Sequence, residues 1–158
     1  MRILVFSDSH KDTAACAKVV RTIVGTDMII HAGDHASDAK ELEKLFPEIP
    51  VRFVSGNCDF GGAPSELVFE AGGKNFFLTH GPNYRVKYED DYSTLISRAR
   101  ILKCDCAVFG HTHVPFNQNF GDIVVLNPGS IKYGRTYGVI EIENGFVKSA
   151  ICDASYII

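Results

Sequence analysis

Three short apolar segments near the start of the chain, each followed by polar residues, constrain the fold more than any other feature. They cover Arg2–Ser7, Asp27–His31 and Pro50–Ser55, and helical spacing of apolar residues follows the first two. Such alternation of strand and helix predicts a parallel sheet with right-handed crossover connections. The polar residues that end these strands would then meet at one edge of the sheet, where open α/β sheets bind ligands.

The spacing of apolar residues predicts helices over Thr13–Val24 and Ser37–Phe46. We expect Asp12 to cap the first helix and Ser37 to cap the second, which ends before Pro47. Because Asp12 takes the capping position, the polar residues before it stay free for another role.

The pattern changes after the third strand. Two glycine pairs bracket the apolar segment Glu66–Glu70, and a further strand over Lys74–Thr79 completes a predicted antiparallel hairpin. A helix over Asp91–Leu102 and a buried strand over Cys104–Phe109 follow. Short strands then alternate with turns, of which Asn144-Gly145 is a strong hairpin signal. The sequence therefore predicts an α/β (α+β) fold in a single domain spanning residues 1–158.

Composition excludes several classes of function. The net charge is −3 and no block of basic residues occurs, which argues against a surface for nucleic-acid phosphates. No apolar segment approaches the length of a membrane span, and the apolar run at the N-terminus is too short for a signal peptide. The five cysteines form no C-x-x-C pair, so we expect reduced thiols in a cytoplasmic protein.

The histidines gather beside the ends of predicted strands. All six lie in or next to such clusters, at His10, His31, His35, His80, His111 and His113. The last two are two residues apart, so in an extended strand they would share a face, whereas in an irregular loop they can diverge toward different ions. Asp8, Asp34 and Asn57 add oxygen donors. Imidazole mixed with oxygen suits Mn, Fe, Zn or Ni better than Ca, so the pattern predicts a transition-metal site.

Five motifs in order resemble those of the calcineurin-like metallophosphoesterase family. They are Asp8-x-His10, Gly33-Asp34, Gly56-Asn57-Cys58-Asp59, His80-Gly81 and Gly110-His111-Thr112-His113. Each is weak alone, but their order and spacing over Asp8–Ser130 are most similar to the small bacterial and archaeal YfcE-type phosphodiesterases. The resemblance implies a four-layer αββα sandwich of two mixed β-sheets flanked by helices.

The resemblance also implies a ligand set and a reaction. Asp8, His10 and His113 would hold one metal ion, Asn57, His80 and His111 would hold a second, and Asp34 would bridge the two. The implied activity is that of a metal-dependent phosphodiesterase that hydrolyses a small phosphoester by in-line attack of a metal-bridging hydroxide. The implied cofactors are two divalent ions per chain, with Mn²⁺ as the first candidate and Ni²⁺, Fe²⁺ or Zn²⁺ as alternatives.

One position departs from the pattern of the wider family. Most members have a histidine that protonates the leaving group where this chain has Cys58, and the counterpart of Asp59 orients that histidine. A thiol of ordinary pKa is a poor proton donor for an alkoxide. The expected catalytic residues are Asp34, Asn57, Cys58 and Asp59, with the hypothesis that Cys58 limits the enzyme to good leaving groups. The alternative is that Cys58 only packs.

Three further residues have weaker roles on sequence alone. Arg135 follows the turn Asn127-Pro128-Gly129-Ser130 and is a candidate for contacting the substrate phosphate, although Gly134 stands where the family usually has proline. We expect His35 to face solvent or cap a helix, and His31, inside a strand, to pack or to support a ligand.

A second class of function stays open, namely a non-catalytic metal-binding interaction module on the same fold. The complete ligand set favours catalysis. The alternative stays open because Cys58 stands where most of the family has a histidine that donates a proton. The hairpins after His113 could serve formation of a homo-oligomer.

Overall fold

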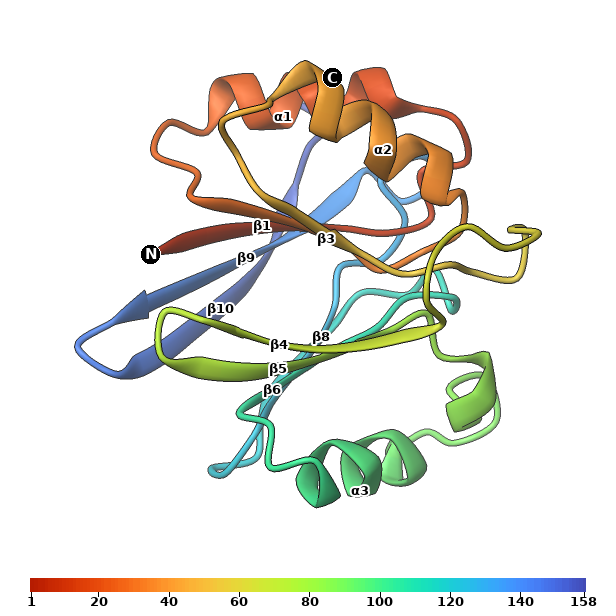
Figure 1. The fold of residues 1–158 in the computed structure, drawn as a ribbon, viewed down its shortest axis with the longest axis vertical. Coiled ribbons are helices and arrows are strands. Elements are labelled where there is room, and N and C mark those ends of the chain that lie inside the picture. Colours follow the sequence, from red (N-terminus) through yellow and green to blue (C-terminus); the bar gives the residue numbers. More distant parts are fainter.

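Two mixed five-stranded sheets pack face to face in the computed structural model, which describes residues 1–158 (Figure 1). The first sheet holds β1 (Arg2–Phe6), β2 (Met28–His31), β3 (Val51–Phe53), β9 (Thr136–Glu143) and β10 (Phe146–Asp153). The second holds β4 (Glu66–Ala71), β5 (Lys74–Thr79), β6 (Cys106–Val108), β7 (Phe116–Asn119) and β8 (Val124–Asn127). Helices α1 (Thr13–Thr22) and α2 (Ala36–Leu45) cover one outer face, and α3 (Ser93–Ile101) covers the other. The four-layer αββα sandwich is thereby confirmed.

The first sheet has the order β10-β9-β1-β2-β3, in which the last three strands are parallel. Their register aligns Phe6 with His31 and His31 with Phe53. The three strands therefore end level with one another, and the polar residues that follow them reach the same edge. The predicted parallel unit is confirmed.

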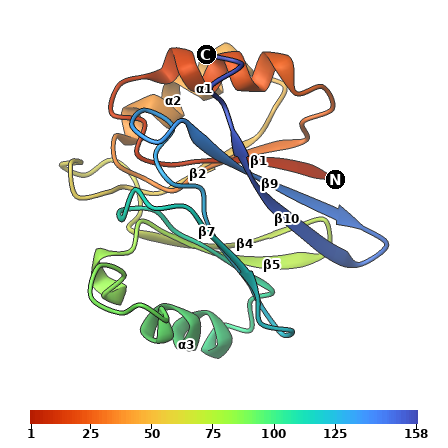
Figure 2. The same cartoon turned by 180° about the vertical axis from the view of Figure 1, so that it is seen from behind.

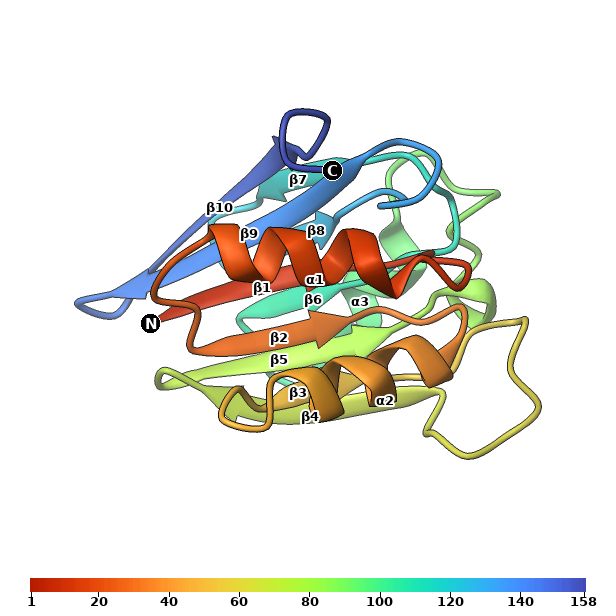
Figure 3. The same ribbon diagram turned by 90° about the horizontal axis from the view of Figure 1, so that it is seen from above.

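The second sheet has the order β4-β5-β6-β8-β7, with β5, β6 and β8 parallel and the outer strands antiparallel. Leu78, Val108 and Leu126 lie in register near the ends of the parallel strands. The loops after β1, β2, β3, β5 and β6 all gather at one end of the sandwich (Figure 3). Seen from behind (Figure 2), β7 and β10 lie side by side, where the side-chain amide of Asn117 (Nδ2) donates to the Ser149 carbonyl at 2.9 Å.

Burial on both faces explains the continuous apolar sequence of β1. Ile3 and Val5 point into the core between the sheets, whereas Leu4 and Phe6 pack beneath α1 and α2. A third apolar cluster lies beneath α3. A strand that is buried on both faces has an unbroken apolar sequence. Packing on both faces fixes β1 and therefore the start of the loop that carries Asp8 and His10.

The helices begin near the predicted positions, with one correction. Asp12 caps α1 and accepts a hydrogen bond from the Ala15 amide at 3.2 Å, as expected. The prediction of Ser37 as the cap of α2 is wrong, because the helix begins at Ala36 and His35 stands at its N-cap without a capping hydrogen bond from its side chain. The Asp59 carboxylate instead accepts from the Ala36 amide at 2.9 Å. No helix in the structure is both long and apolar enough to span a membrane.

Candidate metal centre

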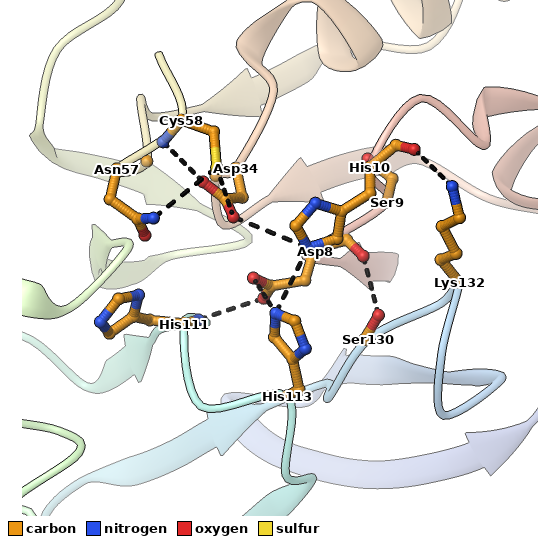
Figure 4. A network of polar contacts seen from close by, with 12 residues as sticks. Asp8, Ser9, His10, Asp34, Asn57, Cys58, His111, His113, Ser130 and Lys132 are labelled. Atoms are coloured by element: carbon orange, nitrogen blue, oxygen red, sulfur yellow. Dashed lines mark hydrogen bonds and ion pairs between the residues drawn. The ribbon is translucent and has the colours of Figure 1, made fainter.

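All seven predicted ligand residues lie together at the end of the sandwich where the strand-end loops gather (Figure 4 shows six of them). Each comes from a loop directly after a strand: Asp8 and His10 after β1, Asp34 after β2, Asn57 after β3, His80 after β5, and His111 and His113 after β6. Both sheets therefore contribute, and the aligned strand ends of each sheet set the spacing between the loops.

The first group consists of Asp8, His10, Asp34 and His113, whose donor atoms all lie within 4.8 Å of one another. His113 Nε2 is 3.1 Å from Asp8 Oδ1 and 3.3 Å from His10 Nε2. His10 Nε2 is in turn 3.7 Å from Asp34 Oδ2. Two imidazole nitrogens and two carboxylate oxygens thus face a common point, a donor set suited to a first-row divalent cation.

The second group is centred on His80. Its Nε2 atom lies 3.0 Å from Asn57 Oδ1 and 3.2 Å from His111 Nδ1. The same atom is 3.8 Å from Asp34 Oδ1. One oxygen of Asp34 therefore faces the first group and the other oxygen faces the second, which is the placement that a bridging carboxylate requires.

The loop after β6 sends its two histidines to different groups. His111 and His113 both adopt left-handed backbone, with φ of 69° and 60°. An extended segment would place both imidazoles on one face, whereas this conformation turns one toward His80 and the other toward Asp8. Of the two arrangements considered from the sequence, the structure has the divergent one.

Hydrogen bonds from neighbouring residues fix the orientation of Asp8. Ser7 Oγ donates to Asp8 Oδ2 at 2.6 Å, and the His111 amide donates to the same oxygen at 3.1 Å. Ser130 Oγ donates to the Asp8 main-chain carbonyl at 2.8 Å (Figure 4). Asp8 Oδ1, by contrast, is buried and accepts no hydrogen bond, although the ring nitrogen His113 Nε2 lies 3.1 Å away. A buried carboxylate oxygen left this way costs about 1–3 kcal/mol or more, and a cation at that point would satisfy it.

Two of the ligand imidazoles, those of His10 and His111, have lowered pKa values that favour the neutral, metal-binding form. Burial lowers the pKa of His10, and burial together with nearby His80 lowers the pKa of His111 to about 4. His80 Nδ1 lies 2.8 Å from the Ala32 carbonyl, which orients the other ring nitrogen, Nε2, into the site. Neutral imidazole is the ligand form. Together with the buried Asp8 oxygen that accepts no hydrogen bond, this shows that the residues fit divalent cations.

Cys58 contacts Asp34 through both its backbone and its side chain. Its amide donates to Asp34 Oδ1 at 2.9 Å, and its Sγ donates to Asp34 Oδ2 at 3.4 Å. Burial and this contact raise the pKa of the thiol. Burial opposes ionisation of Asp34, but the hydrogen bonds from Cys58 and the charge of His80 outweigh it, so the pKa of that carboxyl is lowered.

The two remaining candidates from the sequence, Asp59 and Arg135, contact backbone groups. Both oxygens of Asp59 accept backbone hydrogen bonds, from Gly56 at 2.8 Å and Ala36 at 2.9 Å, so Asp59 ties the loop after β3 to the start of α2. Arg135 donates to the Ile158 carbonyl at 3.4 Å and packs against the C-terminal segment. The structure therefore does not bring Arg135 among the seven ligand residues.

Two residues that the sequence did not single out contact the cluster instead. Lys132 Nζ donates to the His10 carbonyl at 2.9 Å (Figure 4). The Tyr133 ring stacks on His113, with 5.6 Å between ring centroids and 19° between planes, while 64% of its surface stays exposed. Only their position after the turn ending at Ser130 could have indicated them. His31 is fully buried against Ser9 Oγ at 2.9 Å, as expected of a packing or supporting histidine.

Comparisons with known proteins agree with the geometry. Residues 1–145 match the family described as the calcineurin-like phosphoesterase superfamily domain. The probable metallophosphoesterase YsnB of Bacillus subtilis is 34% identical over 91% of this chain and 86% of its own length. A crystal structure of a predicted phosphoesterase from Streptococcus pneumoniae is 31% identical, with a TM-score of 0.80 over 97% of this chain and 89% of the other.

Two more distant structures share the fold. An archaeal phosphodiesterase aligns with a TM-score of 0.69 at 21% identity, over 96% of this chain and 100% of the other. Vps29 of Entamoeba histolytica in complex with Zn²⁺ aligns with a TM-score of 0.70 at 21% identity, over 98% of this chain and 100% of the other. At these identities the likeness concerns the fold alone.

Proposed function

Because the chain belongs to the calcineurin-like phosphoesterase superfamily, we propose that it hydrolyses phosphodiester bonds with the help of two divalent metal ions. The observation that carries this proposal is the position of Asp34. Its Oδ2 lies 3.7 Å from His10 and its Oδ1 lies 3.8 Å from His80, so a single carboxylate separates two complete donor groups. Two groups that share one carboxylate favour a pair of ions over a single ion.

The residues of the chain then have distinct tasks. A bound pair of ions supplies a water of lowered pKa and neutralises charge on the phosphate. Asp8, His10 and His113 would hold one ion, and Asn57, His80 and His111 the other, while the Cys58 amide keeps Asp34 between them. Because these donors are held by backbone and side-chain hydrogen bonds, little reorganisation is needed when substrate binds.

The surroundings of the site favour a small substrate with ready access. Cys58 is exposed, and 37% of the His113 side chain is accessible. Cys58 occupies the position of the missing proton donor, and its raised pKa keeps the thiol protonated. A thiol donates weakly to an alkoxide leaving group, so substrates with good leaving groups are expected to react fastest. Mn²⁺ remains the first candidate metal, and a cytoplasmic location and self-association stay predictions.

The test is hydrolysis of bis(p-nitrophenyl) phosphate by chelator-stripped protein, with Mn²⁺, Ni²⁺, Zn²⁺ or Mg²⁺ added back in turn. We expect activity with Mn²⁺ or Ni²⁺, two bound ions per chain by elemental analysis, and loss of activity in Asp34→Ala. Asp122→Ala is the matched control, because that carboxylate pairs with Arg100 on the surface. One ion per chain, or equal activity of Asp34→Ala and wild type, would contradict the proposal.

A non-catalytic metal-binding interaction module is the second candidate. The observation that favours it is Cys58, which fills the position of the leaving-group acid with a weak donor. The same experiment separates the two candidates. Two bound ions without hydrolysis of any diester or monoester would favour the interaction module.

A further inference from the structure

A second set of metal-binding side chains lies beside the candidate metal centre, formed by His10, His35 and Cys58. Their donor atoms all lie within 4.8 Å of one another, the same bound that describes the group around Asp8. This set contains a sulfur and two imidazole nitrogens and no carboxylate. Only His10 belongs to both sets, so the two sets compete for one side chain.

The position of His35 is set by the backbone. This residue adopts a left-handed conformation, with φ of 75°, at the N-cap of α2, and its ring takes no part in capping. The ring instead meets His10 edge-on, with 5.4 Å between centroids and 72° between planes. Non-glycine residues in this backbone region are uncommon and are held there by their surroundings. The fold thus presents the imidazole of His35 to His10.

The position of Cys58 is set by Asp34. The amide of Cys58 bonds one carboxylate oxygen and its sulfur bonds the other, the oxygen that faces His10. The sulfur therefore lies on the side of Asp34 that is turned toward His10 and His35. Figure 4 labels Cys58, Asp34 and His10. Cys58 has only a weak role in the proposed hydrolysis, but it has two neighbouring imidazoles with which it could bind a metal ion.

We propose that His10, His35 and Cys58 form a separate site for a thiophilic divalent ion, Zn²⁺ above all, and that filling it inhibits the enzyme. Zinc binds thiolate at about 2.3 Å and imidazole at about 2.0–2.1 Å, with a water completing an open site. The Cys58 S–H bond breaks, its electron pair forms the sulfur–zinc bond, and the proton passes to solvent. The harder ion Mn²⁺ prefers the group around Asp8, which has two carboxylates, and gains little from sulfur.

Inhibition of hydrolysis follows because both sites use His10 as a ligand. This part of the inference rests on the proposed function. An ion held by Cys58 and His35 draws His10 Nε2 away from Asp34 and His113, from which it now lies 3.7 and 3.3 Å. The hydrolytic group would then keep Asp8, Asp34 and His113 only. Zinc binding at the new site, by contrast, does not depend on any catalytic activity.

The decisive experiment titrates metal-free protein with Co²⁺, which reports sulfur ligation through a thiolate-to-cobalt charge-transfer band in the near ultraviolet. We expect the band in wild type, its loss in Cys58→Ser and its weakening in His35→Ala. Cys152→Ser is the matched control, because Cys152 is a partly exposed cysteine on β10 and its replacement should leave the band unchanged. No band in wild type, or an equal band in Cys58→Ser, would overturn the proposal.

A second measurement adds Zn²⁺ to Mn²⁺-loaded protein during hydrolysis of bis(p-nitrophenyl) phosphate, with each variant compared with its own rate in Mn²⁺ alone. Loss of even an outer-shell partner typically costs about 10–100-fold in metal affinity. Half-inhibition of Cys58→Ser should therefore need at least about tenfold more Zn²⁺ than wild type. Equal inhibition would mean simple replacement of Mn²⁺ at the hydrolytic centre and would refute the inhibitory role. A protein with the cobalt band but no hydrolysis would refute the proposed function and leave the new site established.

Discussion

Replacement of Gly110 by alanine tests whether close packing of the β6 loop against the β1 loop positions Asp8. Gly110 needs no left-handed backbone, so the change introduces only volume. A methyl group there would overlap Ser7 Oγ and approach Asp8 Oδ2 to 2.9 Å and the Ala32 carbonyl to 3.1 Å. These neighbours are buried and hydrogen-bonded, so they have little freedom to move. Overpacking of a rigid site costs about 1–3 kcal/mol, and we expect Gly110→Ala to lie near 3 kcal/mol.

A double-mutant cycle with Ser7→Ala isolates the cause. Ser7→Ala alone should cost about 1.5–3 kcal/mol, because it removes a buried hydrogen bond to the Asp8 carboxylate. In the double variant the overlap with Ser7 Oγ is gone, so the two costs should fall short of additivity by at least about 1 kcal/mol. Gly134→Ala, where the nearest atom would be 3.2 Å away, serves as the control and should cost clearly less.

The assay is urea unfolding of chelated protein, followed by metal titration of each variant. Gly110→Ala should also weaken metal binding, since the shifted carboxylate belongs to the first donor group. Strict additivity of Gly110→Ala and Ser7→Ala would refute the reasoning, because it would mean that the cost of Gly110→Ala does not arise at Ser7. Unchanged metal affinity would show that Asp8 keeps its position despite the added methyl group.

Three further predictions concern the site and its support. Cys58→His should raise the rate on alkyl diesters more than on aryl diesters, because imidazole supplies the missing proton donor; an unchanged ratio of the two rates would sink the idea. Asp59→Ala should destabilise the protein by about 1–2 kcal/mol in urea unfolding, since it removes the hydrogen bonds to Gly56 and Ala36 at the start of α2, and a midpoint equal to wild type would contradict that role. Addition of Mn²⁺ to chelated protein at about 100 times its Kd should add about 2.7 kcal/mol of stability for each bound ion and raise the Tm by about 5–11 °C per ion, whereas Asp34→Ala should show little of this shift in calorimetry.

The polar clusters at the strand ends were predictable because two independent features of the sequence locate them. Apolar runs locate buried strands, and parallel neighbours must end at the same edge, so Asp8, Asp34 and Asn57 converge whatever the details of the loops. The motif resemblance extended this to His80 and the two histidines after β6. Local capping by Asp12 was equally readable, because donor and acceptor lie three residues apart.

Long-range choices were not readable in the same way. The start of α2 is set by Asp59, which lies 23 residues beyond Ala36 in the sequence, so the local preference for Ser37 as a cap lost to a tertiary contact. The same holds for Lys132 and Arg135, two cations three residues apart in one loop. Only the course of the backbone after Ser130 decides that the first meets His10 and the second meets the C-terminal segment.

Backbone strain at the candidate metal centre links these observations to its chemistry. Asp8, His10, Asp34, His111 and His113 all have positive φ values between 44° and 69°. Each such residue costs of order 1 kcal/mol or more and persists only where the surroundings hold it. Here the surroundings are two rigid sheets whose strands end level with one another, so the loops between them must turn sharply to bring their side chains together. These conformations lower the stability of the metal-free protein, and the buried Asp8 oxygen that accepts no hydrogen bond lowers it further. Since bound cations would offset both, the stability of this protein should depend on metal more strongly than its large apolar core alone would suggest.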